Sequence, residues 1–200
     1  MPARSKRARR GPAAAGHRLR IIGGQWRGRR ITFADAPGVR PTPDRVRETV
    51  FNWLQPVIAG ARCLDLFAGS GALGFEALSR GAAQVVMVDA DARVAAQLRD
   101  QGGMLQAAGL EVLVAEAQQY LAGPAPAGFD IVFLDPPFGR GLLGPCCRSL
   151  EAGGWLTAGA RIYLEAERSL QALPLPESWT LIRSKQAGQV GYHLAVRQNP

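Results

Sequence analysis

The stretch that decides the fold is Asp65-Leu66-Phe67-Ala68-Gly69-Ser70-Gly71-Ala72-Leu73-Gly74. The apolar run before it, residues 61–66, predicts a buried strand. Residues 71–79 predict a helix, because their apolar side chains recur at helical spacing. The glycines fall at the strand-to-helix turn, where the backbone must come close to a ligand. Such a turn is typical of the ligand-binding edge of an α/β sheet.

The acid at the start of this stretch bears on the ligand. Gly69, Gly71 and Gly74 match the dinucleotide pattern G-x-G-x-x-G. Asp65 ends the strand four residues before Gly69, however, and its carboxylate would repel a pyrophosphate. A ligand with an ammonium and a sulfonium would be attracted instead, and S-adenosylmethionine has both. The turn therefore favours S-adenosylmethionine, with a dinucleotide or a turn without a ligand as alternatives.

Strands and helices alternate along the rest of the chain. The hydrophobic pattern predicts strands at 84–88, 111–115, 129–134 and 161–166, helices at 91–106, 118–122 and 141–151, and an antiparallel pair at 179–184 and 190–196. Asp91 is expected to cap the helix that it opens, and Gly102 and Gly103 should weaken that helix. The pattern predicts a Rossmann-like α/β fold, with a mostly parallel seven-stranded sheet, right-handed crossovers and one antiparallel strand.

Four consecutive strands each end at an acidic residue: Asp65, Asp89, Glu116 and Asp135. Capping of the following helix would explain any one of them. Four in a row predict a shared pocket. In that pocket Asp89 could bind ribose hydroxyls, and Glu116 could accept a hydrogen bond from the amine of an adenine.

A second motif, Asp135-Pro136-Pro137-Phe138, follows the strand at 129–134. Two prolines cannot continue a ladder of hydrogen bonds, so this turn leaves its carbonyls free. The Asp135 carboxylate and the Pro136 carbonyl could accept the two N–H bonds of an exocyclic amine, and Phe138 could stack on its ring. Such acceptors make a delocalised amine a better nucleophile. The alternative is a stiffened loop that caps the next helix.

Positive charge is concentrated at the start of the chain. Residues 1–30 contain ten Arg or Lys and no acidic residue, whereas the remainder contains 14 basic and 16 acidic residues. Residues 18–22 and 29–33 predict the strands of a basic hairpin, a surface suited to RNA phosphates. Trp26 near its tip could stack on an unpaired base or cover the apolar face of the hairpin. We divide the chain into a disordered basic tail (1–17), the hairpin extension (18–42) and a transferase domain (43–200).

The segment Arg40-Pro41-Thr42-Pro43 predicts extended backbone, followed by a helix that Thr42 caps and that runs to Leu54. The apolar stripe expected to face the core of this helix consists of Val46, Val50, Phe51, Trp53 and Leu54. Arg45 and Arg47 are expected to lie off that stripe.

No apolar run reaches the roughly 18 to 20 residues of a membrane span, and no apolar segment follows the basic start as in a secretory signal. Cys63, Cys146 and Cys147 lack metal-ligand spacing, so no metal is expected. A reducing cytoplasm is the simplest compartment.

Five stretches of the sequence resemble known methyltransferases. The glycine turn and the Asp135 motif look like those of a Rossmann-fold S-adenosylmethionine-dependent methyltransferase that acts on exocyclic amines. Residues 20–29 (RIIGGQWRGR), 40–54 (RPTPDRVRETVFNWL) and 188–192 (GQVGY) are similar to the RsmD family of bacterial 16S ribosomal RNA (guanine-N2)-methyltransferases. The resemblance covers the chain from about residue 18 to the end.

This resemblance implies a role for individual residues. Catalysis would fall to Asp135, Pro136 and Phe138. S-adenosylmethionine would contact Thr42, Asp65, Phe67, Gly69, Gly71, Asp89 and Glu116. RNA would contact Arg20, Trp26, Arg27, Arg29, Arg30, Arg40, Arg45 and Arg47. The expected partner is small-subunit ribosomal RNA within an assembling 30S particle, and the expected state is a monomer.

Other functions are compatible with the same motifs. An adenine-N6 or protein-glutamine methyltransferase could also use an acid before Pro-Pro-aromatic, although the basic hairpin disfavours a protein substrate. A ribosome-assembly factor could bind RNA without catalysis, but Asp135 and Phe138 argue against it. A dinucleotide oxidoreductase ranks third.

Overall fold

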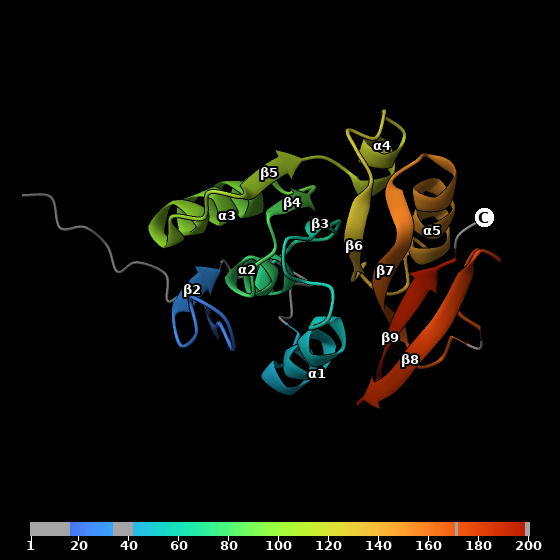
Figure 1. Ribbon diagram of the computed structural model, residues 1–200, viewed down its shortest axis with the longest axis horizontal. Helices are drawn as coiled ribbons and strands as arrows, with labels where there is room; N and C mark the ends of the chain where they lie inside the picture. The colour runs from blue at the N-terminus through green and yellow to red at the C-terminus, as the bar shows by residue number, and fades with distance from the viewer. Residues whose placement is uncertain (1–16, 34–41, 171, 199–200) are drawn as a thin grey trace, which may run out of the picture.

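The computed structural model describes residues 17–33, 42–170 and 172–198. Its main sheet has seven strands in the order β5-β4-β3-β6-β7-β9-β8, and β1 and β2 form a separate antiparallel hairpin (Figure 1). The strands are β1 His17–Arg20, β2 Arg30–Phe33, β3 Arg62–Asp65, β4 Gln84–Asp89, β5 Leu110–Val114, β6 Phe129–Leu134, β7 Leu156–Glu167, β8 Trp179–Ala187 and β9 Val190–Arg197. The helices are α1 Asp44–Leu54, α2 Ala72–Ser79, α3 Ala92–Leu105, α4 Ala117–Leu121 and α5 Leu143–Ala152.

The strand order of the sheet reverses at β3. Strands β3 to β5 add outward on one side, and the chain then returns to place β6 and β7 on the other side of β3, all in parallel. Only β9 in this sheet runs antiparallel to its neighbours, β7 and β8. In an open sheet of this kind, ligands bind beyond the carboxyl ends of the strands at the switch point, here β3 and β6. The predicted seven-stranded fold with one antiparallel strand is confirmed.

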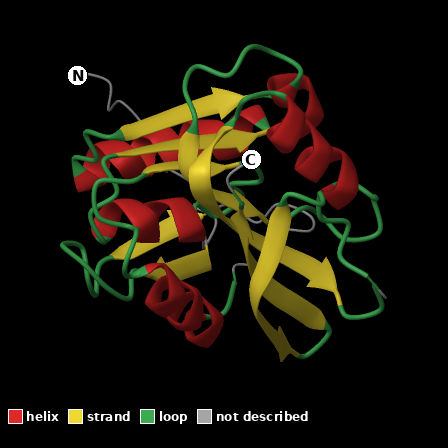
Figure 2. Ribbon diagram, turned by 45° about the vertical axis from the view of Figure 1, so that its right-hand side comes forward, coloured by secondary structure: helices red, strands yellow, loops and turns green. Residues whose placement is uncertain are grey.

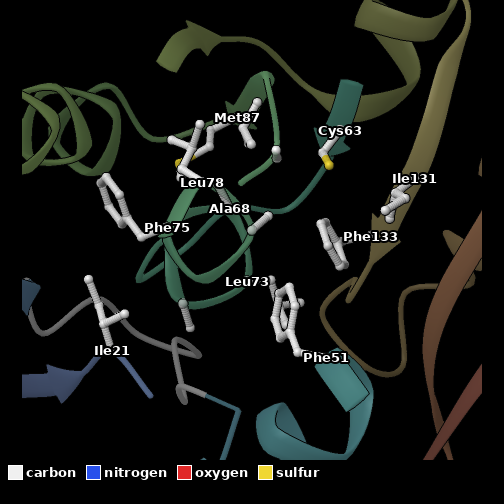
Figure 3. Packing of buried hydrophobic residues seen from close by; sticks show 14 of the residues in the cluster. Ile21, Phe51, Cys63, Ala68, Leu73, Phe75, Leu78, Met87, Ile131 and Phe133 are labelled. Atoms are coloured by element: carbon white, nitrogen blue, oxygen red, sulfur yellow. The ribbon is translucent and has the colours of Figure 1, made fainter. Parts of the chain in front are cut away.

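Helices cover both faces of the sheet (Figure 2). Side chains of β4 alternate between them: Val85 and Met87 join the cluster under α1, α2 and α3, and Val86 and Val88 join the cluster under α4 and α5. On the first face Phe51 of α1 meets Phe133 of β6, with ring centroids 5.9 Å apart (Figure 3). Because both faces of the central strands pack against apolar side chains, these strands have continuous hydrophobic sequences.

The buried carboxylate of Glu76 in α2 holds the hairpin in place. Its two oxygens accept the backbone N–H groups of Ile22 and Gly23, each at 2.8 Å. Arg47 of α1 lies 3.4 Å from the same carboxylate and Arg80 lies 2.7 Å from it. Glu76 and Arg47 are both fully buried. One charged group therefore joins the hairpin, α1 and α2.

Close backbone approach reinforces this junction. The N–H of Gln25 donates to the Ser79 carbonyl at 2.8 Å, and the N–H of Trp26 donates to the Ser79 hydroxyl at 3.0 Å. Gly24 has a φ of +75°, and a Cβ there would lie 1.7 Å from the Ser79 carbonyl oxygen. Only glycine fits this contact. The hairpin therefore packs on the end of α2 as part of the same core.

Two sequence expectations at the start of the chain are wrong. Thr42 does not cap α1: its hydroxyl donates to Glu165 at 3.1 Å, and Pro43 occupies the cap position without a side-chain hydrogen bond. Arg47 does not lie off the core stripe. It is buried, and it donates to Asp44 at 2.6 Å as well as to Glu76. Trp53 in the predicted stripe is only partly buried.

Helix α3 contains the two glycines that were expected to weaken it, Gly102 and Gly103. Asp91 caps the helix as expected, accepting from the N–H of Arg93 at 2.8 Å. The helix continues through both glycines. A Cβ at Gly102 would lie 2.3 Å from Leu110 Cδ2, so this glycine lets α3 approach β5 closely.

No helix in the described ranges is long and apolar enough to cross a membrane.

We predict that Glu76→Ala lowers the free energy of unfolding by about 3 to 5 kcal/mol, because it leaves the buried Arg47 guanidinium with the exposed Asp44 as its one acidic partner among the described residues and deprives the N–H groups of Ile22 and Gly23 of their acceptor. Urea unfolding followed by circular dichroism measures this. Arg93→Ala is the control, since Arg93 forms an exposed pair with Asp91. A loss as small as that of the control would contradict the role given to Glu76.

Candidate active site

Three carboxyl groups meet at the ends of neighbouring strands. Asp65 ends β3, Asp135 directly follows β6, and Glu165 lies near the end of β7. The pairing of Asp65 with Phe133, and of Phe133 with Tyr163, sets these acids side by side along one edge. Of the four acids predicted to share a pocket, Asp65 and Asp135 thus lie on adjacent strands, and Glu165 of β7 extends this row.

Asp65 lies under the glycine turn and is almost fully buried. Its Oδ2 accepts the N–H of Gly74 at 3.2 Å. Burial raises the pKa of Asp65 to about 7, and the charge of Asp89 adds to the shift. This carboxyl is therefore poised to become charged when a cation is placed beside it. A pyrophosphate placed there would instead disfavour the charged form of Asp65.

Asp89 at the end of β4 fixes the shape of the glycine turn. Its Oδ2 accepts the N–H of Gly69 at 2.8 Å, and its Oδ1 accepts the N–H of Asp91 at 2.9 Å. Gly69 and Gly71 both have positive φ angles, of 48° and 75°. Each carboxylate oxygen keeps a second lone pair, so Asp89 can still accept hydrogen bonds from the hydroxyl groups of a ligand.

The turn at residues 135–138 is only partly open to solvent. Asp135 is half-buried, Pro136 is buried, and Phe138 is 44% exposed. The N–H of Gly139 donates to Glu167 at the end of β7 and fixes the end of the turn. Phe138 is thus available to stack on a flat ring beside Asp135.

Glu165, which the sequence reasoning did not single out, is the buried acid of β7. Its Oε1 accepts from the Tyr163 hydroxyl at 2.8 Å and from the Thr42 hydroxyl at 3.1 Å. It stands one residue before the end of the strand expected at 161–166, so the strand-end rule that found the other acids could have found it. Thr42 reaches the site through Glu165.

The surroundings of Asp135 and Glu165 disfavour the charged form of both carboxyls. Burial raises the pKa of Asp135 well above its ordinary value, and the charges of Glu165 and Asp65 raise it further. Burial also raises the pKa of Glu165. Within the part of the chain that the structure describes, no ion pair joins any of the three to a basic side chain. The site therefore suits a positively charged ligand.

The two remaining candidate ligand contacts lie at the margins. Phe67 follows β3, is partly buried and packs against the core of the second face. Glu116 is exposed and stands at the start of α4, two residues beyond β5. Both positions border the same strand ends.

The candidate RNA contacts fall into two groups. Arg20, Arg27, Arg29, Arg30 and Arg45 are exposed, while Arg40 lies outside the described residues. Arg47 is buried in the Glu76 network and cannot contact a phosphate there, so that expectation is wrong. Trp26 is 7% exposed and belongs to the core, which supports the alternative that it covers the apolar side of the hairpin.

Comparisons with known proteins agree with this arrangement. The model of the family described as conserved hypothetical protein 95 matches residues 19–196. The ribosomal RNA small subunit methyltransferase D of Escherichia coli K12 is 51% identical over 180 residues, which cover 90% of each chain. The protein of the same name from Haemophilus influenzae is 45% identical over 186 residues, covering 92% of this chain and 95% of that relative.

Solved structures of similar proteins share the fold. A putative methyltransferase from Escherichia coli superposes with a TM-score of 0.86 at 48% identity, covering 91% of this chain and 99% of its own. A putative methylase from Haemophilus influenzae superposes with a TM-score of 0.80 at 41% identity, covering 92% of this chain and all of its own.

The raised pKa of Asp65 predicts a pH-dependent cost to stability. An acid whose pKa is about 3.8 when unfolded and about 7 when folded destabilises the protein increasingly as the pH rises between those values. Asp65→Asn keeps an acceptor for Gly74 but removes the charge. We expect it to stabilise the ligand-free protein at about pH 8, by at most about 4 kcal/mol.

Urea unfolding of both proteins at about pH 8 and about pH 4 measures the effect. At the lower pH Asp65 is largely protonated in the folded protein and no longer raises the pKa of Asp135, so the advantage of the variant should almost vanish there. A wild-type protein as stable as the variant at the higher pH would contradict the buried, costly carboxylate.

Proposed function

This chain belongs to the RsmD family of ribosomal RNA methyltransferases, and on that premise we propose that it methylates the exocyclic N2 amine of one guanosine in small-subunit (16S) ribosomal RNA, with S-adenosylmethionine as donor. The observation that carries the proposal is the placement of the Asp135-Pro136-Pro137-Phe138 turn beside Asp65, at the ends of the adjacent strands β6 and β3. This placement supports a turn that binds the amine next to a site for a cation.

The residues at the strand ends fit this donor. Its ammonium and sulfonium suit Asp65, a buried carboxyl without a basic partner among the described residues. Its ribose hydroxyls suit Asp89, which is held by the glycine turn. Glu116 and Phe67 would contact the adenine side. When bound, S-adenosylmethionine supplies a methyl group on a positively charged sulfur.

The chain itself prepares the amine. The Asp135 carboxylate and the Pro136 carbonyl would accept the two N–H bonds, which makes the nitrogen pyramidal and withdraws its lone pair from delocalisation into the ring. Phe138 stacks on the base and fixes its angle, so that proximity contributes much of the rate. The raised pKa of Asp135 makes this carboxylate a stronger base for the proton that the amine releases.

The substrate must offer a base outside its helix, because a stacked and paired guanine hides its amine edge. The exposed arginines of the hairpin lie on an element fixed to α2 by Glu76, and we assign them to phosphates near that base. We further propose that a monomer acts on an assembling 30S particle in the cytoplasm.

Asp135→Ala should reduce methyl transfer by at least about a hundredfold and leave donor binding nearly unchanged, because it removes an acceptor that acts on the amine. The assay is transfer of labelled methyl to small subunits that lack the modification, followed by mass analysis of the nucleosides. The matched control is Asp100→Ala, an exposed acid on α3.

Full activity of Asp135→Ala would refute the amine site. Label recovered in N6-methyladenosine or in a protein would point to one of the two other amine substrates.

Arg27→Ala together with Arg29→Ala should weaken RNA binding and lower the slope of log affinity against log salt by roughly 1.4 to 1.8, which corresponds to two phosphate contacts. Filter binding over a salt series measures the slope. Arg93→Ala with Arg148→Ala removes the same charge from α3 and α5, both exposed. Equal slopes in the two double variants would remove the hairpin from the RNA surface.

A further inference from the structure

A hollow lined by residues of β7, β8 and β9 lies beside the turn at residues 135–138, the catalytic turn. We call it the β7–β9 pocket. Its volume is about 360 Å³, within the roughly 300 to 1,000 Å³ of small-ligand sites. The lining residues that matter here are Glu167, Leu170, Leu181, Gln186, Gly191 and His193.

Gly191 keeps this pocket open. It pairs with Ala166 of β7 and Gln186 of β8, and a Cβ at this position would lie 2.7 Å from His193 Nε2. The Ser184 hydroxyl lies 2.9 Å from His193 Nδ1 and orients the ring. Burial lowers the pKa of His193, so the ring is neutral at physiological pH. The close approach of the His193 ring thus explains why glycine occupies position 191 in the GQVGY stretch, which the catalytic site does not explain.

The pocket and the catalytic turn share a wall. Glu167, which lines the pocket, accepts the N–H of Gly139 directly after Phe138. Leu170 and Leu181 at the pocket are 46% and 43% exposed, and Phe138 is similarly exposed. Apolar surface left open on both sides of one hydrogen bond indicates a continuous binding surface.

The charge around the pocket suits a nucleic acid. Arg168 belongs to its lining, and Arg183 and Lys185 stand on β8, where residues 180–186 are all exposed. Glu167 is the opposing acid in the lining. Leucines offer apolar contact to a base, Gln186 and His193 offer hydrogen bonds to its edge, and the basic side chains can contact the phosphates.

We propose that the β7–β9 pocket holds a nucleotide of the RNA next to the target guanosine. The inference rests on the proposed function and extends it to a second base. Turning the target base out of its helix breaks the stacking of its neighbour as well. A pocket that receives the neighbour offsets part of that loss.

The direct test places the photo-crosslinking residue p-benzoylphenylalanine at position 181 and, as a control, at the exposed position 158 near the other end of β7. Each protein is irradiated with small subunits that lack the modification, after its methyl transfer has been measured. We expect position 181 to crosslink to ribosomal RNA within a few nucleotides of the methylated guanosine, and position 158 not to do so.

A crosslink from position 181 to a ribosomal protein, to distant RNA, or no crosslink from a protein that transfers methyl would overturn the pocket while leaving the proposed function intact. Absence of transfer by the wild-type chain would instead refute the proposed function, and the pocket assignment with it.

Two substitutions give an independent measurement. Gly191→Ala displaces the His193 ring, because the added Cβ would lie 2.7 Å from its Nε2, and His193→Ala removes the hydrogen bonds of the ring without touching the backbone. Each should raise KM for the particle about tenfold, with kcat and donor binding unchanged. Gly103→Ala in α3, where an added Cβ meets no atom, is the control. If both variants keep the KM of the control, the pocket does not bind substrate.

Discussion

The active site depends on the crowding of buried carboxyl groups at one edge of a parallel sheet. Asp65, Asp135 and Glu165 lie at the ends of three neighbouring strands, and burial together with mutual repulsion raises the pKa of Asp135. Such an arrangement costs stability in the free protein. It is explained by a ligand that brings positive charge, because the same carboxyls then become favourable contacts. The same buried carboxyls therefore lower the stability of the free protein and make the site selective for a cationic donor.

A second buried charge fixes the surroundings of this site. Glu76 binds two backbone N–H groups of the hairpin and lies against Arg47 and Arg80. Because Glu76 belongs to the helix that starts at the glycine turn, the basic hairpin and the donor site are built on the same rigid element. If the hairpin binds RNA as proposed, that RNA is held at a fixed place relative to the strand ends. The arrangement requires no hinge between an RNA-binding unit and a catalytic unit.

Local sequence patterns predicted the sheet well and the long-range polar contacts poorly. The strand at 129–134 has the predicted bounds, since its apolar run ends at an acid and two prolines. Thr42 was expected to cap a helix, but Glu165, 123 residues away in the chain, accepts its hydroxyl hydrogen bond. Arg47 was expected at the surface, because its partner Glu76 lies on another helix and no local rule reveals that pair. Glu165 could have been found by extending the strand-end argument to β7.

The most direct test of the account is the proton balance of donor binding. Isothermal titration calorimetry with S-adenosylmethionine at about pH 6, in buffers of different ionisation enthalpy, measures the protons exchanged on binding. Asp65 is mostly protonated in the free protein at that pH, since its pKa is about 7. The account predicts that binding releases protons and that Asp65→Asn releases fewer. Binding without proton release in the wild-type protein would contradict the central role of the buried carboxyls.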